Sequence, residues 1–394
     1  MTRVLTLNAG SSSIKFAVFS TGDAPEELAS GQIESLYSFG GVLSLKWQGK
    51  KTKTELGQAD HVEGVRAILD AVAPVLDGQG VAAIGHRVVH GGTVYDAPAV
   101  LTDEVMATLE KFVPLAPLHQ PHNLAAVRAA MEAFPDAVQV GCFDTAFHRG
   151  HPWVNDTFAL PRRYYEAGVR RYGFHGLSYD YIAGAMARID PQGADRTVVC
   201  HLGNGASMCA LRDGQSVAST MGFSALDGLP MGTRCGQLDP GVMLYLMEQE
   251  GMDAKAISDL LYKESGLKGL SDLSIDMRVL EGAGTMEADQ AIEYFVFRIR
   301  RELGSLAAVL GGLDTVVFTG GIGENSANIR GKVCSDMEWI GITLDEAANA
   351  EHAAVISSGD VTVRVIPTDE ELVIATAAIS ALEDARSMVA CASR

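Results

Sequence analysis

The chain has 394 residues, and at roughly 100–200 residues per domain this length predicts two domains. Hydrophobic residues make up 47% of the chain and charged residues 20%, which excludes a disordered protein. The 49 Asp and Glu residues outnumber the 31 Lys and Arg residues and give a formal net charge of −18. This acidity argues against a general binder of nucleic acids or of anionic membranes.

Short β-branched runs alternate with longer amphipathic runs along the chain. Apolar residues recur three and four positions apart over 62–76 and 292–310, which predicts two helices. The alternation predicts an α/β protein whose sheets are covered by helices. The strand-like runs are 4–7, 14–19, 42–47, 137–143, 197–202, 315–319 and 361–366.

Two strand–turn–strand patterns, about two hundred residues apart, indicate a duplication. In the first, a strand runs into Asn8-Ala9-Gly10 and three serines before the run 14–19; in the second, a strand runs into the turn 203–205 before the run 208–211. Such turns bring backbone N–H groups close to a phosphate. The stretch 151–163, which contains Pro and Arg, is the best candidate for a boundary between two halves.

A third glycine turn, 319–325, follows the strand-like run 315–318 and precedes a helical stretch from about Ala327. A glycine turn that joins a strand to a helix is a common phosphate or nucleotide site. The G-K-[ST] ending of a Walker A loop is absent, so the turn is not a P-loop.

Three basic residues lie beside such turns. Lys15 directly follows the serine turn, where it is either a phosphate partner or a solvated strand lysine. Arg87 and Arg234 are each framed by glycines, in the segments 85–92 and 232–236. A guanidinium matches the fork of a carboxylate or of a transferring phosphoryl group, and two such arginines in an acidic chain favour a binding role over a structural one.

Asp144 directly follows the strand-like run 137–143, where a carboxylate can orient a metal or cap a helix. Three histidines, His119, His175 and His201, lie next to Gly, Pro or Asn residues. An imidazole at such a position can donate to developing negative charge. Glu370 follows Thr368 and precedes an apolar helix, and Thr368-x-x-Glu371 has the pattern of a helix capping box.

The six cysteines have no C-x-x-C spacing, and the N-terminal segment is too polar for a signal peptide. No run of 18 apolar residues is free of charge. These features predict a cytoplasmic protein with reduced thiols.

Taken together, the motifs resemble the acetate kinase family over essentially the whole chain. The order and spacing of the motifs carry this resemblance, since none of them suffices alone. They are LNAGSSSIKF (7–16), GHRVVHGG (85–92), FDTAFH (143–148), YGFHG (172–176), HLGNG (201–205), MGTR (231–234) and FTGGIGEN (318–325).

The resemblance implies a two-domain, ribonuclease-H-like and actin-like ATPase fold with a duplicated β-sheet core and an interdomain cleft. It implies an acyl and Mg²⁺ domain over 1–149 plus a C-terminal helix over 375–394, and a nucleotide-binding domain over 150–374. The implied reaction is the reversible, in-line transfer of the γ-phosphoryl group of ATP to acetate, giving acetyl phosphate and ADP. The implied metal is Mg²⁺, with Mn²⁺ as an alternative, and the implied assembly is a homodimer.

The resemblance also implies roles for individual residues. Asp144, Arg87, Arg234 and His175 would be catalytic, and Asn8 and Glu370 would hold the metal. The acyl group would contact Arg87, Val89, Leu118, His119, Phe174 and Ala225. The residues that would contact ATP are Lys15, Ser11, Ser13, His201, Leu202, Gly203, Asn204, Gly205, Asp276, Met277, Arg278, Gly320, Gly321, Ile322, Gly323, Glu324 and Asn325.

Three positions depart from the family pattern. Asp369 replaces an Asn beside the expected metal site, and Gln237 replaces an expected Asp. Ala225 stands where many members have a proline, which enlarges the expected acyl pocket. One methylene is worth only about 1–3 kcal/mol in discrimination, so a kinase that prefers propionate or butyrate is the nearest alternative. A more remote alternative is an actin-like or chaperone-like ATPase, although such a switch has no need of a carboxylate-binding arginine.

Overall fold

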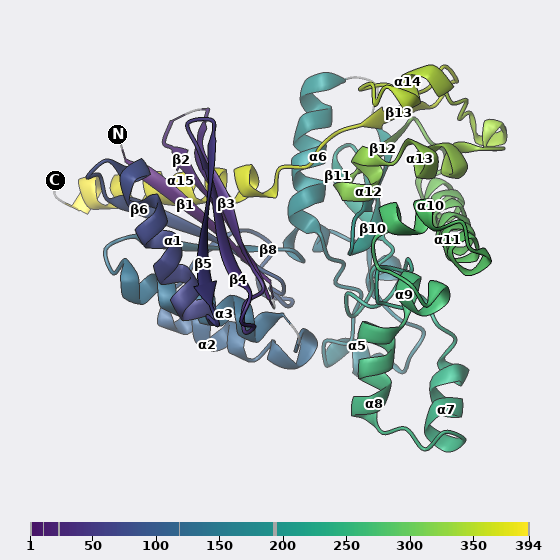
Figure 1. The fold of residues 1–394 in the computed structure, drawn as a ribbon, viewed down its shortest axis with the longest axis horizontal. Coiled ribbons are helices and arrows are strands. Elements are labelled where there is room, and N and C mark those ends of the chain that lie inside the picture. Colours follow the sequence, from purple (N-terminus) through teal and green to yellow (C-terminus); the bar gives the residue numbers. More distant parts are fainter. Residues whose placement is uncertain (1, 11, 23, 118, 192–194, 393–394) are drawn as a thin grey trace. The chain divides into compact units, whose positions relative to one another are not determined.

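The computed structural model describes residues 2–10, 12–22, 24–117, 119–191 and 195–392. The chain divides into two compact units (Figure 1). Unit 1 consists of Met1–Arg149 and Asp369–Arg394, and unit 2 consists of Gly150–Thr368. No helix in the described part of the chain is long and apolar enough to cross a membrane.

Unit 1 is built on an eight-stranded mixed sheet in the order β5-β4-β3-β2-β1-β6-β8-β7. β1 pairs antiparallel with β2 and parallel with β6, and β6 pairs parallel with β8. The strands are β1 (Arg3–Ala9), β2 (Ile14–Ser20), β3 (Glu27–Glu34), β4 (Gly41–Trp47), β5 (Lys50–Gly57), β6 (Val81–Val88), β7 (Ala99–Val100) and β8 (Val138–Phe143).

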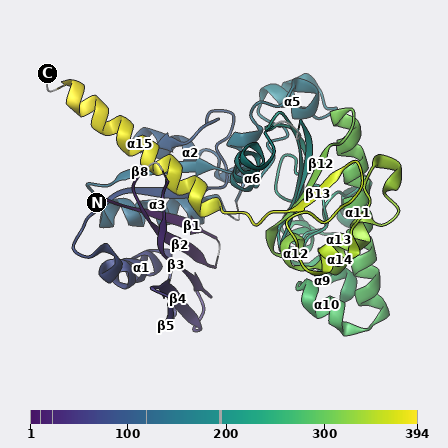
Figure 2. The same ribbon diagram turned by 90° about the horizontal axis from the view of Figure 1, so that it is seen from above.

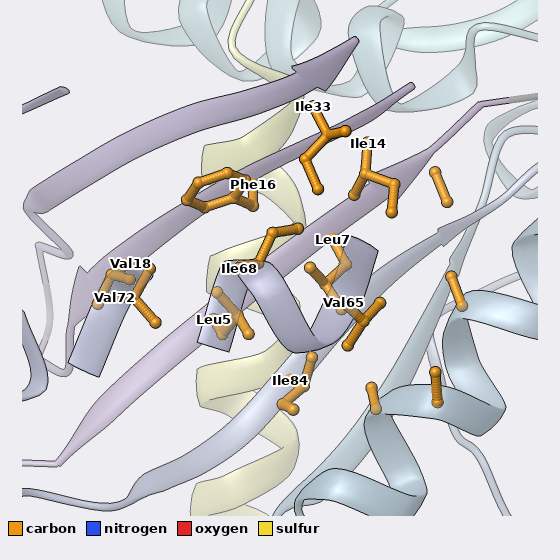
Figure 3. Close-up of a cluster of buried hydrophobic side chains, with 14 of the residues drawn as sticks. Leu5, Leu7, Ile14, Phe16, Val18, Ile33, Val65, Ile68, Val72 and Ile84 are labelled. Atoms are coloured by element: carbon orange, nitrogen blue, oxygen red, sulfur yellow. The ribbon is translucent and has the colours of Figure 1, made fainter. Parts of the chain in front are cut away.

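Helices cover both faces of this sheet. Successive side chains of a strand point to opposite faces, and both faces of these strands are apolar. On β2, Phe16 and Val18 belong to the core beneath α1 (Figure 3), whereas Ala17 and Phe19 pack with α15. α15 runs along β1, β6 and β8 (Figure 2). The helices are α1 (His61–Leu76), α2 (Asp103–Glu110), α3 (Gln120–Ala133) and α15 (Glu370–Ala392), with short 3₁₀ turns at Val113–Leu115 and Ala146–His148.

The predicted helix over 62–76 is confirmed as α1. Asp60 and Glu63 form a capping box at its first turn. The apolar stripe Val65, Ile68 and Val72 is fully buried against the sheet (Figure 3).

Unit 2 is built on a five-stranded sheet in the order β11-β10-β9-β12-β13. The strands are β9 (Arg196–Leu202), β10 (Ala206–Arg212), β11 (Gln215–Ser219), β12 (Thr315–Thr319) and β13 (Thr362–Val365). The helices are α4 (Trp153–Asp156), α5 (Arg162–Glu166), α6 (Gly176–Ile189), α7 (Pro240–Glu248), α8 (Ala254–Asp259), α9 (Gly266–Ser271), α10 (Met277–Ala283), α11 (Met286–Leu310), α12 (Gly320–Asn325), α13 (Ala327–Cys334) and α14 (Glu346–Ala350), with a π-turn at Leu260–Glu264 and a 3₁₀ turn at Glu338–Ile340.

The two sheets repeat one topology, as the paired turns predicted. In each unit an antiparallel meander (β1-β2-β3 or β9-β10-β11) is followed by two parallel strands (β6-β8 or β12-β13) on the side of its first strand. The turn after β1 therefore corresponds to the turn after β9. The mixed α/β class and the duplicated core are confirmed.

Two local predictions were wrong, and one central strand was missed. The missed strand is β6, which extends into the glycine-rich segment 85–92 as far as Val88; Gly85 lets α15 approach because an added Cβ would lie 2.4 Å from Ile374 Cγ2. The glycine run 320–325 is itself the helix α12 rather than a turn before one. Asp369, not Thr368, caps α15: its Oδ1 accepts from the amide of Leu372 at 2.9 Å.

Candidate active site

The first group of predicted site residues lies at the carboxyl ends of β1, β6 and β8 in unit 1. Arg87 is the next-to-last residue of β6 and Asp144 directly follows β8, and the parallel pairing of these strands sets them side by side. The Arg87 guanidinium donates from Nε to Asp144 Oδ1 at 3.0 Å and from Nη2 to Oδ2 at 2.5 Å. Its Nη1 donates to Asn8 Oδ1 at 3.1 Å, and Asn8 Nδ2 donates to Glu370 Oε2 at 3.5 Å. Four predicted residues thus form one hydrogen-bonded chain.

The charges of this chain are strongly coupled. Burial opposes the charged form of Arg87, but Asp144, together with Glu370 and Glu371, raises the pKa of Arg87 above its ordinary value. Burial also raises the pKa of Glu370 to about 7, with further raising by Asp144 and Glu371 against the opposing effect of Arg87. Burial is thus the main reason that the charged form of Glu370 is disfavoured, and Arg87 offsets only part of this effect.

The turn after β1 is closed by its own backbone. Gly10 N donates to Ser13 O at 2.8 Å, while Asn8 and Lys15 face each other across the hairpin. Directly opposite residues of a pair of strands project from the same face, so both side chains lie beside the turn. Ser11, predicted to contact ATP, and Leu118, predicted to contact the acyl group, lie outside the described residues.

Buried side chains that the sequence did not single out hold this corner together. Asn123, on α3, is 1% exposed; its Nδ2 donates to Ala9 O at 2.5 Å and its Oδ1 accepts from Val89 N at 2.9 Å. His61, at the start of α1, hydrogen-bonds Gly10 O through Nε2 at 2.7 Å. Gln120 bonds both backbone groups of His90. Asn123 and Gln120 adjoin the predicted His119, which is the residue that precedes α3.

The second group of predicted residues lies around the turn after β9 in unit 2. His175 has φ of 57° at the start of α6, and its Nδ1 bonds Ser207 Oγ at 2.8 Å. His201 bonds Ser178 through Nδ1 at 2.8 Å, and the two imidazole rings stack with centroids 4.3 Å apart. The hydroxyls fix the direction of both rings.

Arg234 approaches the same turn. A Cβ added to Gly205 would lie 3.3 Å from His175 Nε2 and 3.8 Å from Arg234 Nη2. Arg234 Nη1 donates to Ala225 O at 2.9 Å, which brings the predicted acyl-pocket position Ala225 next to the guanidinium. Burial raises the pKa of the neighbouring Cys235 thiol, which keeps it protonated.

A cavity of about 700 Å³ adjoins this turn. Gly203 and Asn204 line it from the turn, and α10 and α12 line it from the other sides. Eight of the residues predicted to contact ATP line it: Gly203, Asn204, Asp276, Met277, Arg278, Gly321, Ile322 and Asn325. Three further lining residues, Ile275, Glu281 and Ser326, follow or precede predicted segments and were missed.

Glu324, also predicted to contact ATP, supports the chain instead of lining the cavity. Its Oε1 accepts from Gly320 N at 2.8 Å and from Thr368 N at 3.3 Å. Gly320 has φ of 76°, and a Cβ there would lie 2.8 Å from Leu202 O. Only glycine allows this approach of α12 to the end of β9.

The remaining predicted residues lie around these two groups. Val89 is buried in unit 1, and Phe174 is buried in unit 2 just before His175. Gln237, which replaces an expected Asp, accepts from the guanidiniums of Arg298 and Arg301.

Comparison with known proteins gives a consistent result. The chain matches the acetokinase family over residues 3–376. It is 57% identical to an acetate kinase from Methylocella silvestris, with 96% of this chain and 98% of the relative covered. The crystal structure of Porphyromonas gingivalis acetate kinase is similar, with a TM-score of 0.87, 40% identity and coverage of 97% and 100%. A propionate kinase from Francisella tularensis has a TM-score of 0.91 and 34% identity over 96% and 99% of the two chains.

Proposed function

The chain belongs to the acetokinase family and is an acetate kinase with ATP and ADP as co-substrates, and we propose that the residues described above carry out its phosphoryl transfer. One observation supports this assignment most strongly. The turn 203–205 lines the nucleotide cavity through Gly203 and Asn204, while His175 and Arg234 approach its last residue, Gly205. A nucleotide in the cavity would thus have its terminal phosphate near two donors.

The chemistry needs charge compensation more than proton transfer. A carboxyl group has a pKa of roughly 4, so acetate is already ionised at neutral pH and needs no general base. Its approach to a polyanion does need cationic donors and fixed positions. In our proposal His175 and Arg234 stabilise the transferring phosphoryl group, and Arg87 orients Asp144 and the acyl carboxylate.

We assign the metal site to Asn8 and Glu370, with Asp144 nearby. Amide and carboxylate oxygens suit Mg²⁺, and a divalent ion would favour the charged form of Glu370, whose pKa is raised mainly by burial. Among the described residues no three His, Cys, Asp or Glu side chains are arranged to hold a metal by themselves. The ion therefore needs further oxygens from phosphate and water, as is usual for Mg²⁺. When bound, it neutralises charge on the reacting phosphates.

Two arginine variants test the assignment. We expect Arg87→Ala and Arg234→Ala each to lower kcat by roughly 10²–10³-fold, the effect of removing one transition-state donor. ATP affinity should change far less, because neither side chain lines the nucleotide cavity. Acetyl phosphate trapped with hydroxylamine measures turnover, and equilibrium binding measures affinity. Unchanged turnover in both variants would reject the proposal.

The acyl preference is a separate question. The similarity to a propionate kinase and the small side chain of Ala225 beside Arg234 favour a pocket that also admits propionate. Comparing kcat/KM for acetate, propionate and butyrate, in wild type and Ala225→Pro, tests this. Proline should shift the preference toward acetate.

We further propose that the enzyme is a cytoplasmic homodimer. α7 has no buried residue, and its exposed apolar side chains form a surface typical of a protein interface. Among the described residues, no disulfide joins the cysteines Cys142, Cys200, Cys209, Cys235 and Cys334, as in proteins of reducing compartments. Light scattering of wild type and Leu244→Glu tests the assembly: a monomer in both would contradict it.

A further inference from the structure

Five polar side chains from the start of α6 and from strands β9 and β10 form one network beside the turn 203–205. They are His175, Ser178, Tyr179, His201 and Ser207. Tyr179 N donates to His175 O at 3.1 Å, and side chains four residues apart lie on the same face of a helix. Ser207 pairs with His201 across the strands, and directly opposite residues project from the same face of a sheet. The helix and the strands meet through the side-chain bonds of Ser178 and Ser207.

Ser207 lies between a phenol and an imidazole. Its Oγ is 2.5 Å from the hydroxyl oxygen of Tyr179 and 2.8 Å from His175 Nδ1. Ser207 and Tyr179 are both fully buried, whereas His175 is only partly buried. A serine hydroxyl has one proton, so Ser207 donates to one of these neighbours and accepts from the other. The direction of donation therefore decides which nitrogen of His175 carries a proton.

The surroundings favour donation from Tyr179 toward His175. Burial, with a smaller contribution from Cys209, raises the pKa of Tyr179 well above its ordinary value, although the bond to Ser207 opposes this. The phenol therefore keeps its proton and can donate it. When Ser207 accepts from Tyr179, its own proton is directed to Nδ1 of His175.

The other neighbours of His175 favour an uncharged ring. Its imidazole stacks on that of His201 with centroids 4.3 Å apart, so two positive charges there would repel each other. The Arg234 guanidinium approaches the same turn residue as His175 does: a Cβ added to Gly205 would lie 3.8 Å from Arg234 Nη2 and 3.3 Å from His175 Nε2. A neutral imidazole that accepts at Nδ1 carries its proton on Nε2, which is the ring atom nearest to the turn.

We propose that Tyr179 and Ser207 are positioning residues that hold His175 in the tautomer with its proton on Nε2. His175 then presents an N–H beside Arg234, and both groups can donate to a transferring phosphoryl group. The opposite tautomer would present a lone pair to the phosphoryl oxygens and would repel them. This inference rests on the catalytic role proposed above for His175, and it adds Tyr179 and Ser207 to the same site.

The tautomer can be measured directly in the full-length protein. Two-bond proton–nitrogen spectra of protein made with isotopically labelled histidine distinguish a protonated from an unprotonated ring nitrogen. His175→Asn identifies the signals of this residue by their loss, and Asn tolerates the φ of 57° at this position. At neutral pH we expect a protonated Nε2 and an unprotonated Nδ1 in the wild type. A protonated Nδ1 would overturn the proposal.

Turnover gives a second readout. Ser207→Ala removes the donor to Nδ1, so kcat should fall by roughly tenfold, and Tyr179→Phe should lower it by roughly threefold, within the range of one hydrogen bond. KM for ATP and for acetate should change little, because the donation matters in the transition state. The control is Tyr181→Phe, the same substitution on the same helix; residues two positions apart do not face each other, so this variant should keep the kcat of wild type.

His175→Asn also separates this inference from the proposed function. If His175→Asn keeps wild-type turnover, His175 does not stabilise the phosphoryl group, and its proposed role fails together with the positioning role. If His175→Asn is impaired but kcat is unchanged in Ser207→Ala and Tyr179→Phe, only the positioning role is rejected. Should Ser207→Ala not fold, Tyr179→Phe and the spectrum of the wild type decide the question.

Discussion

The turns after β1 and β9 occupy equivalent places in the two sheets, yet the protein holds them by different means. In unit 1, polar side chains from two helices reach the turn: Asn123 bonds Ala9 O and His61 bonds Gly10 O. In unit 2, backbone from outside the turn packs directly on its backbone: Gly232 N bonds Asn204 O at 3.1 Å, and Gly320 lies against Leu202.

This difference shows that topology fixes where each of the two turns lies but not what stabilises it. Side-chain anchors depend on buried hydrogen bonds and on the protonation state of the groups that make them. Close backbone packing depends on the absence of a Cβ. The two halves should therefore fail under different perturbations.

The largest effect is expected from Gly320→Ala in unit 2. The new Cβ would lie 2.8 Å from Leu202 O at a φ of 76°, so α12 has to move away from the turn. A displacement of about 1 Å at an active site costs roughly 10²-fold, and we expect a loss of this size in kcat/KM for ATP. Steady-state kinetics with varied ATP measures it.

The matched control is Gly304→Ala on α11, where the added Cβ meets nothing within 4 Å. Alanine is the better helix former, so this variant should keep full activity and gain slightly in stability. Equal activity of the two variants would show that close backbone packing does not hold the second turn.

The sequence predicted well the helices and strands that have a regular apolar pattern. Apolar spacing identified α1 and α11, and β-branched runs identified β1, β2, β4, β8, β9, β12 and β13 but not β6. A face that is buried along its whole length requires apolar residues at regular spacing, which is visible in the sequence. The turns after β1 and β9 were likewise recognisable, since tight turns restrict residue choice locally, whereas the third glycine segment is the helix α12.

The remaining features depend on partners far apart in the sequence. β6, which carries Arg87, was not predicted, because Gly85 is typical of a turn and its close contact with Ile374 is set by the tertiary fold. α12 was missed for the same reason: helix propensity is poor over Gly320 and its neighbours, and the contacts of Glu324 stabilise the helix. In the sequence, the only feature that marks Asn123 is its proximity to Pro121 and His119. The backbone groups that it bonds are set by the tertiary fold.

Acid should destabilise unit 1 specifically, because its core buries neutral histidines behind the site. Burial lowers the pKa of His86 to about 4 and that of His90 to about 3, from 6.5. The unfolded chain therefore binds protons below pH 6.5 that the native protein does not. The contribution of each histidine to stability is complete above pH 6.5 and is lost as the pH drops toward 4 and 3, by about 2 kcal/mol per histidine at pH 5. Glu370, whose pKa is raised to about 7, acts in the opposite direction and offsets part of this loss.

Urea unfolding at pH 7.5 and pH 5 measures this loss. His86→Gln removes one titrating group and retains an N–H donor toward Gln139, which His86 bonds at 2.7 Å. The variant should lose less stability between the two pH values than wild type. An identical pH dependence in both proteins would mean that His86 is not kept neutral by the fold.

The smallest effect, and the sharpest test of the side-chain anchors, is expected from Asn123→Asp. The variant keeps an oxygen that accepts from Val89 N, but it replaces the donor to Ala9 O with a second acceptor. A lost buried hydrogen bond costs about 1–3 kcal/mol, so we expect kcat/KM for ATP to fall by about tenfold or more. KM for acetate should change little, since the segment that follows Arg87 keeps its anchor. Asn123→Leu removes both hydrogen bonds, so it should both lower kcat/KM for ATP and raise KM for acetate. If the two variants raise KM for acetate equally, the two hydrogen bonds of Asn123 do not stabilise their segments independently.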